Sequence, residues 1–136
     1  MQRQTIKNII TFLILAEIIL SLYIIFIPEK QFCAPGFDCG AVQSSSYAYM
    51  FGIKLSYFGL LAFSLLFIIN AITLYTEHKG FKHTLRIMII LGSLFSLYFL
   101  FVQFFILHKV CSSCLTVDSL MILILLISIY EYKKYK

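Results

Sequence analysis

The sequence predicts an all-α integral membrane protein, a bundle of four transmembrane helices with one sizeable loop between the first and second spans. Three observations support this fold class. Apolar residues make up 61% and charged residues only 12% of the 136 residues, whereas soluble domains average roughly 45–50% and 25%. The apolar residues gather in four long runs, and the basic residues lie at the ends of those runs. Such a chain cannot bury its apolar surface in one small soluble core, so lipid is its natural solvent.

The four predicted spans cover about residues 7–27, 53–75, 84–107 and 112–130. Each is close to the roughly 20 residues that a helix needs to cross a bilayer. Only helices and closed barrels satisfy their backbones in lipid, and the runs lack the alternation of barrel strands. The first run is longer than the apolar region of a signal peptide and has no cleavage signal after it, so we expect a retained span. We therefore expect a single membrane domain over residues 1–136.

The basic residues predict the orientation of the bundle. In a four-span chain the N-terminus, the 76–86 region around the polar turn at 76–83, and the C-terminal tail lie on one side. That side carries eight basic residues, namely Arg3, Lys7, Lys79, Lys82, Arg86, Lys133, Lys134 and Lys136, and the other side carries Lys30, Lys54 and Lys109. Cytoplasmic loops are enriched in Lys and Arg, so we expect both termini in the cytoplasm and a multi-pass protein of the cytoplasmic membrane. The positive charge then serves as a membrane anchor, and no nucleic-acid partner is expected.

All four cysteines are extracytoplasmic in this topology. Cys33 and Cys39 lie in the long loop, and Cys111 and Cys114 lie at the outer end of the fourth span. Disulfides persist on that side of a membrane. Static disulfides are one interpretation, but a bridge stabilises most when it closes a long loop, and neither pair does so. A zinc site is another, but the C-x5-C spacing exceeds the usual gap of two to four residues, so no metal is expected.

A redox relay between the two pairs is the favoured interpretation. Exchange needs a thiolate that attacks a disulfide sulfur with a resolving thiol nearby. In "VCSSC" the fourth helix is expected to start at or just after Cys111, and a helix N-terminus lowers the pKa of a cysteine there. The spacing of Cys111 and Cys114 puts both sulfurs on one helix face. Two electrons must then leave the dithiol. No haem, dinucleotide or flavin motif is visible, whereas a membrane quinone accepts two electrons and two protons.

Asp118 lies four residues after Cys114 and so shares its helix face. At 1.5 Å per residue it is roughly 10 Å inward from Cys111. An intramembrane carboxylate suggests a function by default, so Asp118 either relays protons to a quinone or forms a polar contact within the bundle.

Other polar residues also occur within the predicted spans. Glu17 lies near the middle of the first span, at a depth similar to that of Ser64 and Ser96. We expect it to form an interhelical hydrogen bond, with a proton path as the second interpretation. Asn70 and Gln103 are expected to be packing contacts.

The segment "FCAPGFDCGAVQSSSYAYMFGIKLSYFGL", residues 32–60, followed some fifty residues later by "CSSC", resembles the vitamin K epoxide reductase family. Its bacterial and archaeal members form a disulfide-generating branch. The resemblance covers essentially the whole chain and implies four helices around a quinone, capped by the loop and its short helix. It implies that Cys111 and Cys114 are the active-site pair, with Cys114 next to the quinone, and that Cys33 and Cys39 are the shuttle pair. It also implies that Ser45 is associated with the redox centre and the quinone.

Two departures from the family pattern favour a simple quinone, ubiquinone or menaquinone, over vitamin K epoxide. Gly40 follows Cys39 where an acidic residue is common, and Leu55 occupies the position of a quinone-contacting asparagine of animal members. Many bacterial members carry a fused thioredoxin-like domain. Because the chain ends at Lys136, we expect a separate thioredoxin-like extracytoplasmic protein as its partner.

The expected function is a membrane thiol oxidoreductase that oxidises its partner and passes the electrons through both cysteine pairs to a membrane quinone, so that disulfides form. One alternative is a reductase of another quinone-like or epoxide substrate. The other is a small membrane scaffold or subunit with structural disulfides.

Overall fold

Four long helices make up most of the molecule, a computed structural model that describes residues 1–27, 33 and 35–136. The helices are α1 (Gln2–Phe26), α4 (Leu55–Tyr75), α5 (Lys79–Phe101) and α6 (Ser112–Lys134), and a π-helical turn, η2 (Val102–Ile106), continues α5. All four are long and apolar enough to cross a membrane, which confirms the predicted fold class. The expectation for Lys30 lies outside the described residues.

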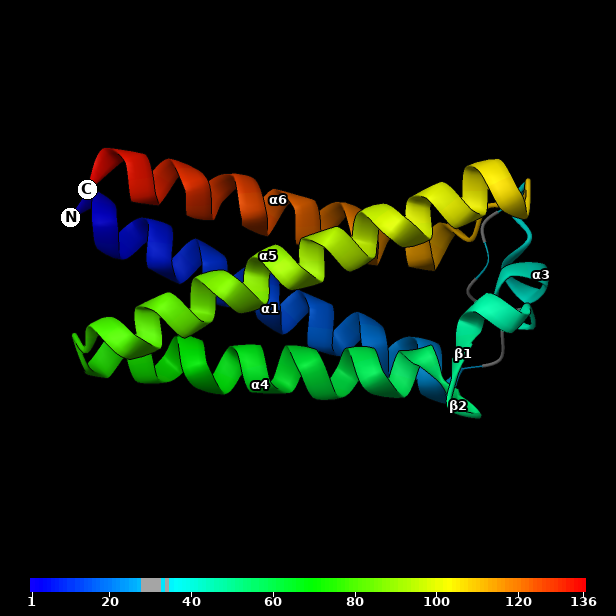
Figure 1. Cartoon of the computed structure of the whole chain (residues 1–136), viewed down its shortest axis with the longest axis horizontal. Helices are drawn as coiled ribbons and strands as arrows, with labels where there is room; N and C mark the ends of the chain where they lie inside the picture. Colours follow the sequence, from blue (N-terminus) through cyan, green and yellow to red (C-terminus); the bar gives the residue numbers. More distant parts are fainter. Residues whose placement is uncertain (28–32, 34) are drawn as a thin grey trace.

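The four helices form a ring in which successive helices run antiparallel (Figure 1). α1 packs against α4 and α6, and α5 packs against the same two helices. Both chain termini and the turn from α4 to α5 lie at one end of the bundle, while the short elements of the long loop cover the other end (Figure 1). Closing the ring gives each helix two neighbours, so each has one face toward the interior and one face left for lipid.

The helices extend further toward the termini than the predicted spans. α1 begins at Gln2, and α5 begins at Lys79, within the region predicted as a polar turn. The imidazole of His78 accepts a hydrogen bond from the Gly80 N–H at 3.3 Å, which caps the start of α5. Apolarity marks the lipid-embedded part of a helix, whereas polar residues with long side chains continue it into the interface.

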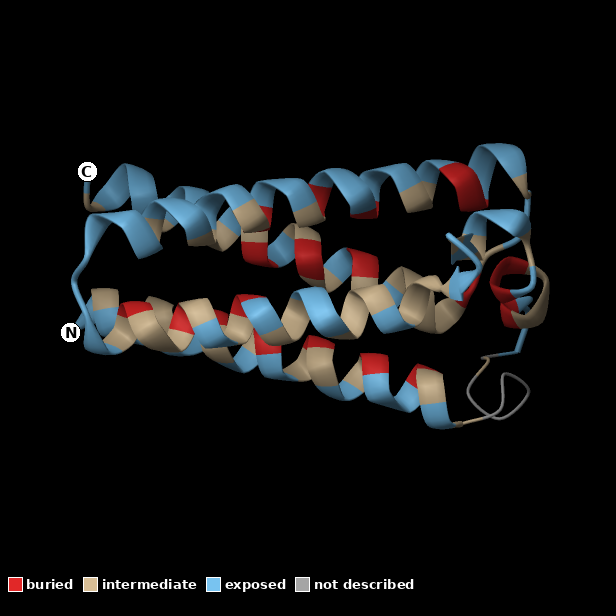
Figure 2. Cartoon of the chain, turned by 60° about the horizontal axis from the view of Figure 1, so that its bottom comes forward, coloured by how far each residue is buried: buried red, intermediate tan, exposed pale blue. Residues whose placement is uncertain are grey.

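The apolar core lies in the half of the bundle nearer the termini. Its buried members come from all four helices and are Ile10, Ile14, Leu66, Ile89, Met121 and Ile124. Buried positions follow the inner faces of the helices, and the outer faces are exposed (Figure 2). Large apolar side chains such as Phe12, Leu61 and Leu94 cover those outer faces. An exposed apolar surface of this extent is suited to contact with lipid.

The short elements of the loop are α3 (Cys39–Gln43), a 3-10 turn η1 (Ser46–Ala48) and a hairpin of β1 (Tyr49–Met50) and β2 (Ile53–Lys54). The strands pair antiparallel, with Met50 opposite Ile53. Both turn residues have positive φ, 55° at Phe51 and 79° at Gly52. Two such residues make a two-residue turn whose twist matches a hairpin. The hairpin leads directly into α4 and so fixes the loop to the bundle.

α5 and α6 approach each other closely at Gly92. A Cβ at this position would lie 2.6 Å from Cε of Met121, the flexible end of a buried side chain, which would have to move. We expect Gly92→Val to lower stability by about 1 kcal/mol, the lower end of the overpacking range, because the methionine end can shift; the measurement is the thermal midpoint in detergent. Gly59→Ala is the control, because its Cβ would meet only Phe63 Cε2 at 3.8 Å. A Gly92→Val protein as stable as the wild type would contradict this account of the packing.

Candidate redox site at one end of the bundle

Asp38 fastens α3 to the segment that precedes α6. Its side chain caps α3 by accepting a hydrogen bond from the Ala41 N–H at 3.1 Å. Its own N–H donates to the Val110 carbonyl at 3.0 Å. Lys109 Nζ lies 3.8 Å from the second carboxylate oxygen, but both side chains are about half exposed, so this ion pair adds little. Asp38 therefore joins the loop to the segment before α6 through one backbone hydrogen bond and one weak ion pair.

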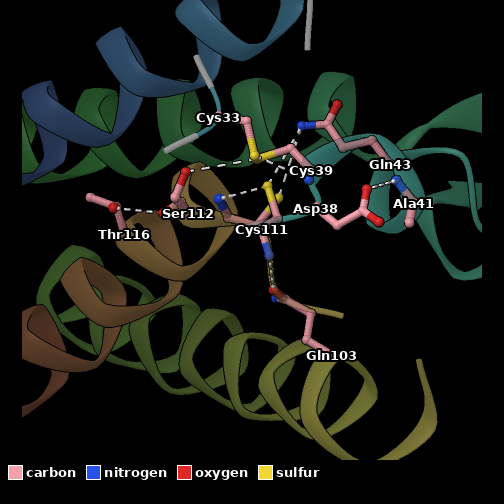
Figure 3. The surroundings of a disulfide bond; sticks show 10 residues. Cys33, Asp38, Cys39, Ala41, Gln43, Gln103, Cys111, Ser112 and Thr116 are labelled. Carbon is pink, nitrogen blue, oxygen red and sulfur yellow. Dashed lines mark hydrogen bonds between the residues drawn. A yellow bond between two sulfur atoms is a disulfide. The ribbon is translucent and has the colours of Figure 1, made fainter. Parts of the chain in front are cut away.

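Cys33 and Cys39 form a disulfide, with their Cα atoms 5.8 Å apart. The Cys39 N–H also donates to Cys33 Sγ at 3.2 Å. The two cysteines differ in access. Cys39 is 1% exposed and lies 3.7 Å from the Ser112 hydroxyl of α6, measured from Sγ to Oγ, whereas Cys33 is only half-buried (Figure 3). The disulfide thus presents one sulfur outward and the other toward α6.

Cys111 and Cys114 are free thiols at the start of α6. Cys111 is the N-cap residue, and its sulfur accepts a hydrogen bond from the Cys114 N–H at 3.4 Å. This confirms that the helix starts just after Cys111. Cys39 and Cys111 belong to one buried cluster, against which Cys33 and Cys114 pack. The fold therefore brings the two sequence-predicted pairs together at one end of the bundle.

The position of Cys111 lowers the pKa of its thiol to about 7. The largest cause is the hydrogen bond with the Cys114 side chain, and the N–H groups of Cys114 and Ser113 and the side chain of Gln43 lower the pKa further. Burial of the thiol opposes these interactions. Free N–H groups at a helix N-terminus stabilise a thiolate. Cys111 is thus the nucleophilic member of its pair near neutral pH.

Two glutamines lie beside this pair, and neither was predicted from the sequence to be part of the site. Gln43 Nε2 lies 4.0 Å from both Cys111 Sγ and Cys114 Sγ. Gln43 is four residues after Cys39, so it shares that side of α3, and this spacing is the signal that was available in the sequence. Its own carbonyl oxygen is buried without a hydrogen-bond partner in the described part of the chain.

Gln103 connects the start of α6 to Asp118. Its Oε1 accepts a hydrogen bond from the Cys111 N–H at 3.0 Å, and its Nε2 donates to Asp118 Oδ2 at 3.5 Å. The first of these contacts is visible in Figure 3. Gln103 lies in the π-helical turn η2, a type of irregularity that occurs often at functional sites. The prediction that Gln103 is a packing contact is wrong, because both ends of its amide are used in hydrogen bonds.

A cavity of about 540 Å³ lies inside the bundle below α3. This volume is within the roughly 300–1,000 Å³ typical of small-molecule sites. Most of its lining is apolar, and α4 and α5 supply about half of the lining residues. Cys114, Asp118 and Ser45 are among its polar members. Leu55 also lines it. Apolar walls with a reactive sulfur on one side and few polar groups fit the flat, largely apolar ring of a quinone.

The remaining predicted residues lie around this cavity. Ser45 lines it, and its hydroxyl donates to the Val42 carbonyl at 2.7 Å. Asp118 lies in the wall and is 7% exposed. Glu17 was expected to form an interhelical hydrogen bond, and this prediction is wrong. Neither of its carboxyl oxygens has a hydrogen-bond partner in the described part of the chain.

A membrane-spanning helical bundle with a disulfide and a dithiol in contact at one end defines a membrane thiol–disulfide oxidoreductase. The sequence comparisons agree with this class. The chain belongs to the vitamin K epoxide reductase family, whose model matches residues 8–129, nearly its whole length. No curated protein matches the chain. The resemblance seen in the sequence is therefore confirmed at the level of the family.

The alkylation rate of Cys111 tests the site geometry. Only the thiolate reacts, so in the reduced protein labelling of Cys111 is expected to rise with pH around a midpoint near 7. Gln43→Leu removes the donor amide and is expected to move this midpoint upward, toward the usual value of about 8.5. Mass spectrometry of the labelled peptides separates Cys111 from the other cysteines. Ser44→Ala, at the exposed end of α3, is the control. An identical midpoint in Gln43→Leu would contradict a role for this amide.

Proposed function

We propose that this chain belongs to the prokaryotic, disulfide-generating branch of its family. It oxidises the dithiol of a thioredoxin-like protein outside the cytoplasmic membrane and passes the two electrons to a membrane quinone. The observation that carries this proposal is the packing of buried Cys39 against buried Cys111, next to an apolar cavity. A structural disulfide has no need of a dithiol beside it, whereas thiol–disulfide exchange requires one.

The distribution of basic residues supports the proposed side of the membrane. The two termini and the turn from α4 to α5 lie at the end of the bundle opposite the cysteines (Figure 1). Eight of the 11 Lys and Arg residues lie in these segments or in the adjoining ends of α1, α5 and α6. Basic residues are retained on the cytoplasmic side, so the cysteine pairs face the oxidising side.

Cys33 is the entry point for electrons, because its sulfur is only half-buried. A partner thiolate attacks Cys33 Sγ, which breaks the bond to Cys39 and forms a mixed disulfide with the partner. The second partner thiolate attacks that mixed disulfide. This releases the oxidised partner and leaves Cys33 and Cys39 as thiols, so two electrons and two protons have entered the chain.

Cys39 then transfers the electrons to the second pair. Its thiolate attacks Cys111 Sγ in the disulfide form of that pair, so the Cys111–Cys114 bond breaks and a Cys39–Cys111 bond forms. Cys33 attacks Cys39, restores the first disulfide and leaves Cys111 and Cys114 reduced. The arrangement in the structure, with the first pair joined and the second free, corresponds to this last stage.

The cavity supports a quinone as the final acceptor. Cys114 lines the cavity, which makes it the sulfur that faces the acceptor. A bound quinone supplies a place for two electrons and two protons, and the apolar walls hold its ring against Cys114. Leu55 offers no hydrogen bond at its position in the wall. This favours a simple ring such as ubiquinone or menaquinone over an epoxide.

Turnover with a purified protein tests this function. A reduced thioredoxin-like protein and a soluble quinone analogue are expected to bleach the quinone absorbance only when the chain is present. Cys114→Ser is expected to abolish the bleaching, because no Cys111–Cys114 disulfide can form. Ser119→Ala, an exposed position on the same helix, should retain full turnover. Undiminished bleaching by Cys114→Ser, or none by the wild type, would rule the function out.

Trapping of a mixed disulfide tests the order of exchange. The double variant Cys33→Ser, Cys114→Ser leaves only Cys39 and Cys111, which pack in one buried cluster. It is expected to form a Cys39–Cys111 disulfide on mild oxidation, detected as a linked peptide by mass spectrometry. The matched variant Cys39→Ser, Cys114→Ser leaves Cys33 and Cys111 and should yield much less linked peptide. Equal or reversed yields would mean that Cys39 is not the exchanging sulfur.

A further inference from the structure

Two carboxyl groups inside the bundle have no role in the exchange path. Glu17 on α1 is 0% exposed, and both of its oxygens lack a hydrogen-bond partner among the described residues. Asp118 on α6 is 7% exposed and interacts electrostatically with Glu17. A carboxylate without water or a donor is costly, and two carboxylates near each other are costlier still. The pair is therefore a natural place to hold a proton.

Asp118 connects this pair to the redox site. It lies one helical turn below Cys114, and both line the cavity. Its carboxylate accepts a hydrogen bond from Gln103, whose other amide atom accepts the N–H of Cys111. The Ser96 side chain of α5 also interacts with Asp118, and both residues line the cavity. Asp118 thus has contact with both the cavity and the start of α6.

The bundle is closed on the far side of the pair. Ile14 lies three residues beyond Glu17, and Met121 three residues beyond Asp118, so each is about 4.5 Å further along its helix. Both belong to the apolar core cluster, where they are 0% and 2% exposed. The next interhelical polar contact, from Asn70 Nδ2 to Thr11 Oγ1 at 2.7 Å, lies level with that cluster, because Thr11 is between Ile10 and Ile14 on α1. The cavity gives the pair a route to the cysteine side, whereas the packed cluster separates the pair from the end that carries the termini.

We infer that Asp118 and Glu17 form a proton-holding pair that serves the quinone in the cavity and exchanges protons only with the cysteine side. This inference rests on the proposed function. Cys111 and Cys114 lose two electrons and two protons as their S–S bond forms, and the quinone gains the same two electrons and two protons. Asp118 gives a proton to a quinone oxygen and takes one from Glu17. The protons released by the two thiols refill the pair, so none is needed from the cytoplasm.

Other titratable groups face the same space and enter the pH dependence. Cys111 and Cys114 interact electrostatically with Asp118. Lys54 and Tyr47 line the cavity near the loop. α5 and the turn η2 contribute uncharged polar side chains to this space, among them Ser96 and Gln103. The pair is therefore identified by removing each carboxyl separately, rather than by a pH profile of the wild type alone.

Asp118→Asn and Glu17→Gln remove the acids and keep their size. With Asp118→Asn we expect quinol formation to fall by about 10²–10⁴-fold, the range of general acid catalysis. With Glu17→Gln we expect a smaller fall that grows as the pH rises, because Asp118 then depends on protons from the cavity alone. Asn70→Ala, a buried position level with the apolar cluster, is the control for general loosening of the bundle. Unchanged quinol formation by Asp118→Asn across pH would overturn the inference.

Two further measurements separate this inference from the proposed function. The first is the reduction of the Cys111–Cys114 disulfide by the partner dithiol, followed by alkylation. It needs no quinone and should proceed normally in both variants. Failure of this step in the wild type would count against the proposed function and not against the pair.

The second measurement is the infrared difference spectrum between the oxidised and reduced cysteine pairs. A protonated-carboxyl signal is expected in the wild type and should be lost in Asp118→Asn and altered in Glu17→Gln. Its absence from the wild type would overturn the inference whether or not the protein reduces a quinone.

The closed far side is tested in vesicles that enclose a pH-sensitive dye. A partner protein added outside reacts only with molecules whose cysteine end faces outward, so their terminus end faces the dye. Turnover should leave the internal pH unchanged when a membrane-soluble quinone is supplied in excess. Internal alkalinisation that follows turnover and is absent with Cys114→Ser would show proton uptake from the terminus side and overturn the inference.

Discussion

Cys111, the N-cap residue of α6, is buried, and its N–H has to find an acceptor inside the protein. A helix leaves its first N–H groups without partners, and neither lipid nor a packed interior can supply water to them. Gln103 accepts the Cys111 N–H, and the Cys111 sulfur accepts the Cys114 N–H. The π-helical turn that carries Gln103 adds a residue to the last turn of α5 and so changes the direction of the following side chains. Satisfying this constraint places a thiol at a helix N-terminus, where its ionised form is stabilised.

The burial of the four cysteines supports the direction proposed for the relay. Cys33 is the half-buried member of the loop disulfide, Cys39 and Cys111 are buried in one cluster, and Cys114 lines the cavity. In the proposed relay the accessible end of this series would meet an aqueous protein, and the other end would meet an apolar ring. Burial, rather than a gate, would then protect the inner sulfurs from attack by the aqueous partner. The four sulfurs therefore lie between the aqueous side and the apolar cavity, and in the proposed relay they connect the reaction on one side with the reaction on the other.

The sequence predicted most of the fold but only part of the site. Apolar runs require helices in lipid, so the four spans followed from composition, and their ends shifted because polar residues continue a helix into the interface. The placement of all four cysteines at one end of the bundle followed from the order of the spans, because the loop after the first span and the start of the fourth span lie on the same side. The contacts of Gln43 and Gln103 could not be predicted, because they depend on how α3 packs on the bundle and on the π-helical turn. The lack of a hydrogen-bond partner for Glu17 among the described residues could not be predicted either. Side-chain pairing across helices has no fixed spacing in the sequence.

The two ends of the bundle have different roles. Beyond Glu17 the interior is a packed apolar cluster contributed by all four helices, which holds the helices together. Between Glu17 and the loop the interior holds the cavity, whose walls are mainly apolar. The loop meets α6 through one backbone hydrogen bond, a half-exposed ion pair that contributes about 0–1 kcal/mol, and the buried contacts of Cys39 and Gln43. These contacts are separate from the apolar cluster, so α3 can part from α6 while that cluster stays intact. Because exchange requires Cys39 to approach Cys111 and then leave it, stability located in the other half of the bundle allows the redox end to change its bonds without unfolding the protein.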